Sequence, residues 1–88
     1  MSNINWSFLI TAAMKNEREQ VMLELAENGW REAELGFIAD QLIALEDLDP
    51  AAQPGTDRQW RDYRTLVRKW SEGTEGYPAP EHRPQRPS

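Results

Sequence analysis

The sequence predicts a mainly α-helical protein with three helices, the last two paired as an antiparallel αα-hairpin, and an extended C-terminal tail. Two segments of similar length repeat apolar residues at steps of three, four and three, which indicates one buried stripe on each of two helices: Leu35, Ile38, Leu42 and Leu45, then Trp60, Tyr63, Val67 and Trp70. A loop of about seven residues joins them, as is typical of adjacent antiparallel helices. Four of the last fifteen residues are proline, which excludes a regular helix there. We expect one small helical domain over residues 1–73 and an extended tail over residues 74–88.

The N-terminal segment is ambiguous between strand and helix. Every second residue from 4 to 10 is apolar: Ile4, Trp6, Phe8 and Ile10. Alternation of this kind predicts a short half-buried strand over residues 3–10. The first two turns of a helix are the alternative, and a run this short leaves both interpretations open.

The first two helices are predicted at about residues 12–28 and 30–48. Thr11 is a suitable N-cap, and Met14, Val21 and Leu25 form the apolar stripe of the first helix. Asn28-Gly29 predicts its end, because both residues tolerate the left-handed conformation that closes helices. The second helix ends before Pro50, since proline disfavours helical geometry in the residue that precedes it.

The third helix is predicted at about residues 57–72. Thr56 and Gln59 have the spacing of a capping box, in which each side chain bonds the other residue's backbone amide. Asp57 lies in the first turn, where a negative charge favours the helix dipole. Gly73 ends the helix. Beyond it, we expect a weakly held chain with few apolar side chains.

The formal net charge of −5 is unevenly distributed along the chain. Residues 1–49 contain ten acidic and three basic residues, whereas residues 50–88 contain five acidic and seven basic ones. An acidic first half excludes a general nucleic-acid surface, because counterion release needs clustered positive charge. We expect the two halves to attract each other, within the fold or between chains, and we expect no nucleic-acid partner.

The residue types give no indication of an enzyme, a metal site or a cofactor. Glu32 with Glu34, and the acidic run at residues 46–49, are the closest carboxylates, but neighbouring helix positions point to different sides. Exposed helix faces are therefore expected for both. His82, the only histidine, lies in the proline-rich tail, and there are no cysteines, so the usual zinc ligand sets cannot be assembled. No run approaches the roughly 18 apolar residues of a membrane span.

The remaining large side chains are typical of protein contacts. We expect Trp60 and Trp70 in the core, and we expect the arginines of the third helix to serve protein contacts or ion pairs. The proline-rich tail has the composition of a recognition segment that lies extended in a groove. The predicted partner-binding residues, in chain order, are Trp6, Trp30, Arg61, Arg64, Tyr77, Pro78, Arg83, Pro84, Arg86 and Pro87.

Three stretches together resemble a known family. They are Trp30-Arg31-Glu32-Ala33-Glu34-Leu35, then Trp60-Arg61-Asp62-Tyr63-Arg64 with Leu66 and Trp70, and finally Gly76-Tyr77-Pro78 with Arg83-Pro84 and Arg86-Pro87-Ser88. Their order and spacing are similar to those of small bacteriophage tail assembly chaperones, the tail-fibre assembly proteins. Those proteins show W-R-x-x-E-L, W-x-x-Y-R-x-x-L-R-x-W and F-P…R-P-x-x-P patterns. Here Tyr77 replaces the commoner phenylalanine, and Lys69 replaces the usual arginine. The resemblance covers about 60 residues.

The resemblance implies a non-enzymatic assembly factor that helps a phage tail or tail-fibre protein to fold. It implies location in the host cytoplasm, with retention on the virion tail and homo-oligomer formation left open. Two alternatives follow from the residues and their charge. One is a small acidic regulatory binder, such as an antitoxin or an inhibitor of a nucleic-acid enzyme, and the other is a permanent structural subunit of the tail.

Overall fold

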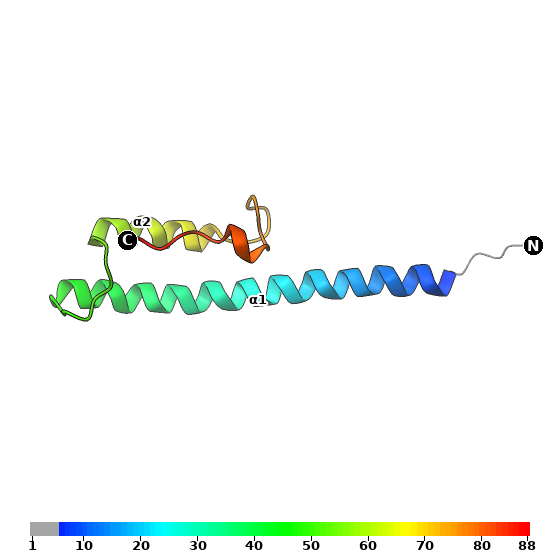
Figure 1. Cartoon of the computed structure of the whole chain (residues 1–88), viewed down its shortest axis with the longest axis horizontal. Coiled ribbons are helices and arrows are strands. Elements are labelled where there is room, and N and C mark those ends of the chain that lie inside the picture. The colour runs from blue at the N-terminus through cyan, green and yellow to red at the C-terminus, as the bar shows by residue number, and fades with distance from the viewer. Residues whose placement is uncertain (1–5) are drawn as a thin grey trace, which may run out of the picture.

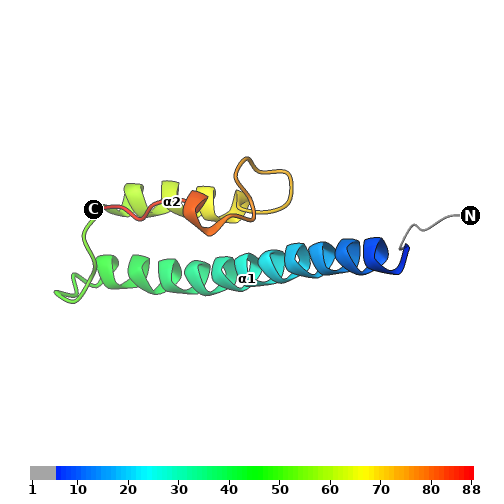
Figure 2. The same cartoon turned by 45° about the vertical axis from the view of Figure 1, so that its right-hand side comes forward.

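The computed structural model describes the backbone of residues 6–88 and the side chains from Ala13 onward. It contains two α-helices, α1 (Trp6–Glu46) and α2 (Asp57–Lys69), and one short 3-10 turn, η1 (Pro80–His82). Helix α2 lies alongside the C-terminal half of α1, and the tail returns beside both helices (Figures 1 and 2). The prediction of a mainly helical protein is confirmed, but two α-helices form within residues 6–88 rather than three.

Helix α1 is continuous where the sequence predicts two helices. The predicted end at Asn28-Gly29 is wrong, as is the N-cap at Thr11, because both positions lie inside a helix of 41 residues. The side-chain oxygen of Asn28 accepts a hydrogen bond from Arg31 at 3.0 Å, so it does not cap a helix end. Of the predicted strand over residues 3–10, residues 6–10 are helical and the rest lie outside the described residues.

Helix α1 ends in a Schellman motif two residues before the predicted boundary. The amide of Asp49 donates to the carbonyl of Ala44 at 2.9 Å, and the amide of Leu48 donates to Leu45 at 3.2 Å. Leu48 takes the left-handed position of this motif, with φ of 57°. The loop that follows is tied to α1 by Gln41, whose buried side-chain amide pairs with the backbone of Gln53 at 2.8 and 3.0 Å.

Helix α2 begins as predicted and ends three residues early. The capping box between Thr56 and Gln59 is formed in both directions. The helix ends at Lys69 with Trp70 as its C-cap, so the predicted boundary at residue 72 is wrong. Arg31 of α1 donates to the carbonyl of Trp70 at 2.7 Å and thereby bonds a carbonyl at the end of α2.

The core is one seam between the two helices. It contains Ile38 and Leu42 from α1 and Trp60, Tyr63 and Val67 from α2, all of which the apolar spacing predicts. The predicted hairpin of two equal helices needs correction, because the 13-residue α2 packs on one part of a far longer helix.

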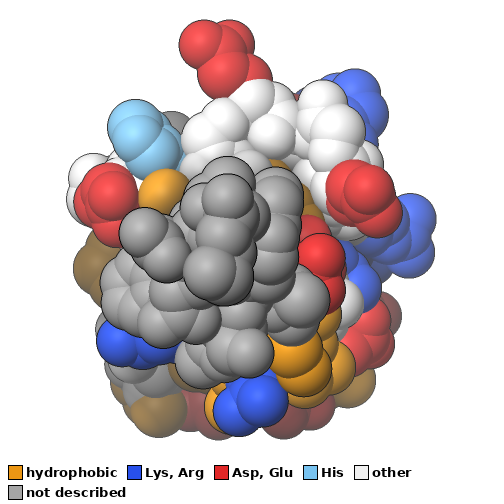
Figure 3. Space-filling view, turned by 90° about the vertical axis from the view of Figure 1, so that its right-hand side faces the viewer, with side chains coloured by type: hydrophobic (Ala, Val, Ile, Leu, Met, Phe, Trp, Pro, Cys, Tyr) orange, Lys and Arg blue, Asp and Glu red, His pale blue; other side chains and the backbone are white. Residues whose placement is uncertain are grey.

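The N-terminal part of α1 projects past the body of the molecule (Figure 1). We call residues 13–26 the arm. All side chains of residues 13–23 are exposed. The Cα radius of gyration is 19.6 Å, whereas a compact chain of this length has about 12 Å. Figure 3 looks along the long axis from this end and shows hydrophobic side chains at the surface among charged ones.

Candidate partner-binding site

The C-terminal tail is held by ion pairs to two buried glutamates of α1. We call residues 77–87 the strap. Arg83 donates to both carboxylate oxygens of Glu27 at 2.6 Å, and Arg86 donates to both oxygens of Glu34 at 2.7 Å. Glu27 is 0% exposed and Glu34 is 5% exposed. The expectation of a weakly held tail is therefore wrong, as is that of an exposed helix face at Glu34.

The register of the strap matches the period of α1. Arg83 has φ of −57° and ψ of 146°, which is polyproline II geometry. Three residues of that geometry span about 9 Å, at about 3.1 Å each. The seven residues from Glu27 to Glu34 rise about 10.5 Å along an α-helix. Arginines three apart on the strap therefore meet glutamates seven apart on α1.

Each guanidinium also lies over an aromatic ring, and each carboxylate has a further donor. Arg83 lies 4.8 Å from the ring centroid of Trp30, and Arg86 lies 4.1 Å from that of Phe37. The indole N–H of Trp70 also donates to Glu27 at 3.0 Å, and the hydroxyl of Tyr63 donates to Glu34. No buried side-chain polar atom among the described residues lacks a hydrogen-bond partner.

These contacts shift the pKa values of the groups involved. The hydrogen bonds from Arg83 outweigh the desolvation of Glu27 and hold its pKa below the usual value. Arg86 does the same for the pKa of Glu34, with a smaller contribution from Tyr63. Burial raises the pKa of Tyr63, and its hydrogen bond to ionised Glu34 raises it further. Both glutamates are therefore ionised at neutral pH.

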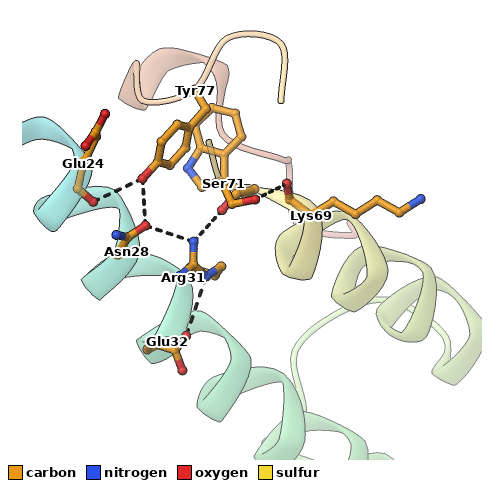
Figure 4. Close-up of polar contacts among 8 residues, drawn as sticks. Glu24, Asn28, Arg31, Glu32, Lys69, Ser71 and Tyr77 are labelled. Carbon is orange, nitrogen blue, oxygen red and sulfur yellow. Dashed lines mark hydrogen bonds and ion pairs between the residues drawn. The ribbon is translucent and has the colours of Figure 1, made fainter. Parts of the chain in front are cut away.

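The strap begins at a polar cluster between the two helices (Figure 4). The hydroxyl of Tyr77 donates to the side-chain oxygen of Asn28 at 2.7 Å and approaches the carbonyl of Glu24 at 3.4 Å. Asn28 also accepts from Arg31, the residue that bonds the end of α2. The Tyr77 ring packs edge-on against Trp70, with centroids 5.4 Å apart.

The strap ends against the loop that precedes α2. Gly55 has φ of 117°, and a Cβ atom there would lie 2.8 Å from Cβ of Pro87 and 2.7 Å from Nε1 of Trp60. Only glycine fits this conformation and this close approach. The strap is thus anchored from one end of α2 to the other.

A second groove, on a different side of the helix pair, is open. It has a volume of about 620 Å³ and is lined by Ala39, Leu42, Ile43, Leu45, Glu46, Asp57, Arg61 and Arg64. A helix turns by about 100° per residue, so Ile43 lies about 120° round α1 from Phe37, which contacts the strap. We call this the open groove.

The predicted partner-binding residues with described side chains thus lie in two places. Trp30 lies on α1 beneath Arg83 of the strap, and the strap contains Tyr77, Pro78, Pro84, Arg86 and Pro87 as well, whereas Arg61 and Arg64 line the open groove. The side chain of Trp6 lies outside the described side chains. Their role in binding a partner stays a prediction.

Glu27, Glu34 and Phe37, which bind the strap, are not among the binding residues predicted from the sequence. A signal for the first two was present, because the seven-residue spacing of the glutamates matches the three-residue spacing of Arg83 and Arg86. Glu32 and His82 are exposed; Glu32 pairs with Arg31 at 3.6 Å, and His82 lies in η1, within the strap.

Within the described part of the chain, no group of histidine, aspartate and glutamate side chains is arranged to hold a metal ion. Neither helix, over its described residues, has the length and apolar character needed to cross a membrane. A scan against protein-family models and searches of curated proteins and solved structures gave no match to this chain.

Proposed function

We propose that the protein is an assembly chaperone for a phage tail or tail-fibre protein and that it acts through protein contacts without catalysis. The resemblance of three sequence stretches to tail-fibre assembly proteins supports this proposal. The observation that carries it is the arm, a regular helix whose apolar side chains have no cover from the rest of the described chain. In this proposal the client packs against the arm in the host cytoplasm.

The strap is poorly suited to be the client-binding element. Its two arginines already pair with Glu27 and Glu34, and a released strap would leave these carboxylates buried without a cation. Client binding through the tail would therefore have to offset the free-energy cost of leaving two buried carboxylates without a cation. The helices offer contact surface without that cost.

The arm offers one apolar stripe. Met14, Val21 and Leu25 are 48%, 50% and 59% exposed and are spaced by seven and four residues, so they share one side of α1. An isolated helix of this length is marginally stable in water, because most helix stability in proteins comes from packing. A client that covers the stripe would stabilise the arm, and the contact would remove apolar surface of both proteins from water.

Co-expression with candidate tail and fibre proteins, followed by purification and mass analysis, tests this proposal. Val21→Asp with Leu25→Asp places charges on the stripe, and we expect the client to be lost from the complex. Circular dichroism and the melting temperature should change little, since both side chains are exposed. Leu23→Asp is the matched control, because Leu23 lies on the other side of the arm and should leave binding intact. Full client binding by the double variant would overturn the proposal.

A further inference from the structure

We propose that the open groove binds an extended segment of the client, with an apolar side chain on the groove floor and a carboxylate on Arg64. This inference rests on the proposed function, because it names a second contact of the same client. The strap covers the groove on one side of the α1–α2 pair. The open groove lies on another side of the pair, where a segment of a second protein can bind in the same way.

Arg64 supplies the free cation of the groove. Arg61 pairs with Asp57 at 2.6 Å, and Arg58 pairs with Asp62 at 3.1 Å, both within α2. Among the described residues, Arg64 has no ion-pair partner, and it is half-buried at the groove wall. A half-buried guanidinium with no ion-pair partner among the described residues is suited to two parallel hydrogen bonds with a carboxylate.

The floor of the groove is apolar and is built partly on the core seam. Ile43 is 56% exposed, whereas Leu42 beside it is 9% exposed and belongs to the core seam. Leu42 is held by the packing of α1 on α2, so this part of the floor does not need to be ordered when a ligand binds. Preorganisation of this kind lowers the entropic cost of association.

The groove continues the stripe of the arm. Ile43 lies 29 residues after Met14, which is about eight complete turns of helix, so both lie on one side of α1. Ala39 lies one turn before Ile43 on that side and is exposed. A client that packs along the arm is thereby directed toward the open groove.

The charges of the groove favour a protein segment over nucleic acid. Glu46 and Asp57 line the groove together with Arg61 and Arg64, so the groove has no excess of positive charge, although Arg64 has no ion-pair partner among the described residues. A phosphate backbone would meet these carboxylates and a chain with a net charge of −5. A segment with isolated carboxylates between apolar side chains brings less negative charge and can place one carboxylate on Arg64.

The test uses the full chain and a short synthetic peptide, acetyl-Ser-Leu-Glu-Leu-Glu-Leu-Ser-amide, titrated by NMR. We expect amide shifts to change at residues 39–46 and 57–68 and not along the strap. Arg64→Gln should weaken binding at least fivefold, whereas Arg58→Gln, also on α2, should leave it unchanged. The same peptide with glutamine in place of glutamate should bind the native chain more weakly.

Three results would overturn this inference: no binding of the peptide, equal affinity for Arg64→Gln and the native chain, or stronger binding of a mixed-sequence oligonucleotide at the same groove. These outcomes are separate from the test of the arm. The purified protein alone reports on the groove, whereas co-purification of the client from cells reports on the proposed function.

Discussion

Arg83 and Arg86 connect the end of the chain to the middle of α1. Each forms a two-bond ion pair with a carboxylate that is almost fully buried, while its own side chain is 31% or 49% exposed. A buried ion pair adds little over an apolar pair of the same shape, but loss of one partner leaves the other charge buried and uncompensated. The strap should therefore be sensitive to the loss of either arginine.

Arg86→Ala tests this sensitivity. We expect the free energy of unfolding to fall by about 2–4 kcal/mol, less than for a fully buried pair because the guanidinium is partly exposed. Arg86→Lys keeps the charge but loses the second bond and the flat contact with Phe37, so an intermediate loss is expected. Urea unfolding followed by tryptophan fluorescence measures both. An unchanged midpoint in Arg86→Ala would show that the pair does not hold the strap.

The pH dependence of stability follows from the same pairs. The pKa of Glu34 is lowered in the folded chain, so its contribution is fully present above the ordinary value of 4.5 and is lost as pH falls through the lowered one. In Arg86→Ala, burial without a cation raises the pKa of Glu34, and protonation then favours the folded state. The destabilisation by Arg86→Ala should therefore shrink as pH falls from 7 to 4. Urea unfolding of the native chain and of Arg86→Ala at several pH values measures this change. A difference in free energy of unfolding that stays constant with pH would contradict the prediction.

Leu48 is a strained residue at the end of α1. Its φ of 57° is costly for a side chain with a Cβ atom, and the leucine is 88% exposed, so packing contributes little in return. Leu48→Gly should raise the free energy of unfolding by about 0.5–1 kcal/mol, because glycine adopts this conformation without strain. Thermal unfolding measures the gain, and Leu48→Val, a β-branched residue, should have the opposite effect.

At the scale of elements, α1 is a helix that tolerates two interior glycines. An exposed glycine costs about 1 kcal/mol relative to alanine, and Gly29 and Gly36 have no atom within 4 Å of where a Cβ would lie. Contacts of Glu27, Trp30 and Arg31 with the strap and α2 hold the backbone helical on both sides of Gly29. Tertiary contacts thus override the local preference of Asn28-Gly29 to end a helix.

Gly29→Ala and Gly36→Ala should each stabilise the protein by about 0.5–1 kcal/mol, since alanine has the higher helix propensity and the space is open. Melting temperatures of the two single variants and the double variant measure this. The effects should add, because the two positions lie about 10 Å apart along the helix. Destabilisation by either change would show that an uninterrupted α1 is not the native structure.

At the scale of the whole molecule, the strap closes one flank of a thin two-helix body. A chain that ends at Gly73 loses both ion pairs, the Tyr77 contact and the cover over Trp30 and Trp70. We expect a loss of on the order of 4–8 kcal/mol, comparable with the 5–15 kcal/mol that stabilises most small domains. The melting temperature should fall by more than about 15 °C, at roughly 4–8 °C per kcal/mol. An unchanged melting transition would show that the tail is dispensable.

Local patterns in the sequence determine that the protein is mainly helical, where α2 begins and which residues form the seam. The spacing of Ile38, Leu42, Trp60, Tyr63 and Val67 predicts the core, and Thr56 with Gln59 predicts the start of α2. The start of α2 depends on interactions between residues three apart, and the seam depends on the helical period of 3.6 residues per turn. Both patterns are visible within a single segment of the sequence.

Tertiary structure alone decides whether Asn28-Gly29 ends a helix, whether Glu27 and Glu34 face water, and where the tail lies. Each of these depends on groups 29 to 56 residues apart in the chain, such as Tyr63 with Glu34 and Arg83 with Glu27. A carboxylate on a polar helix face has the same local sequence whether or not an arginine reaches it. A buried carboxylate is stabilised by an arginine that lies far away in the chain. The tail, which has the local composition of a disordered segment, therefore forms part of the fold.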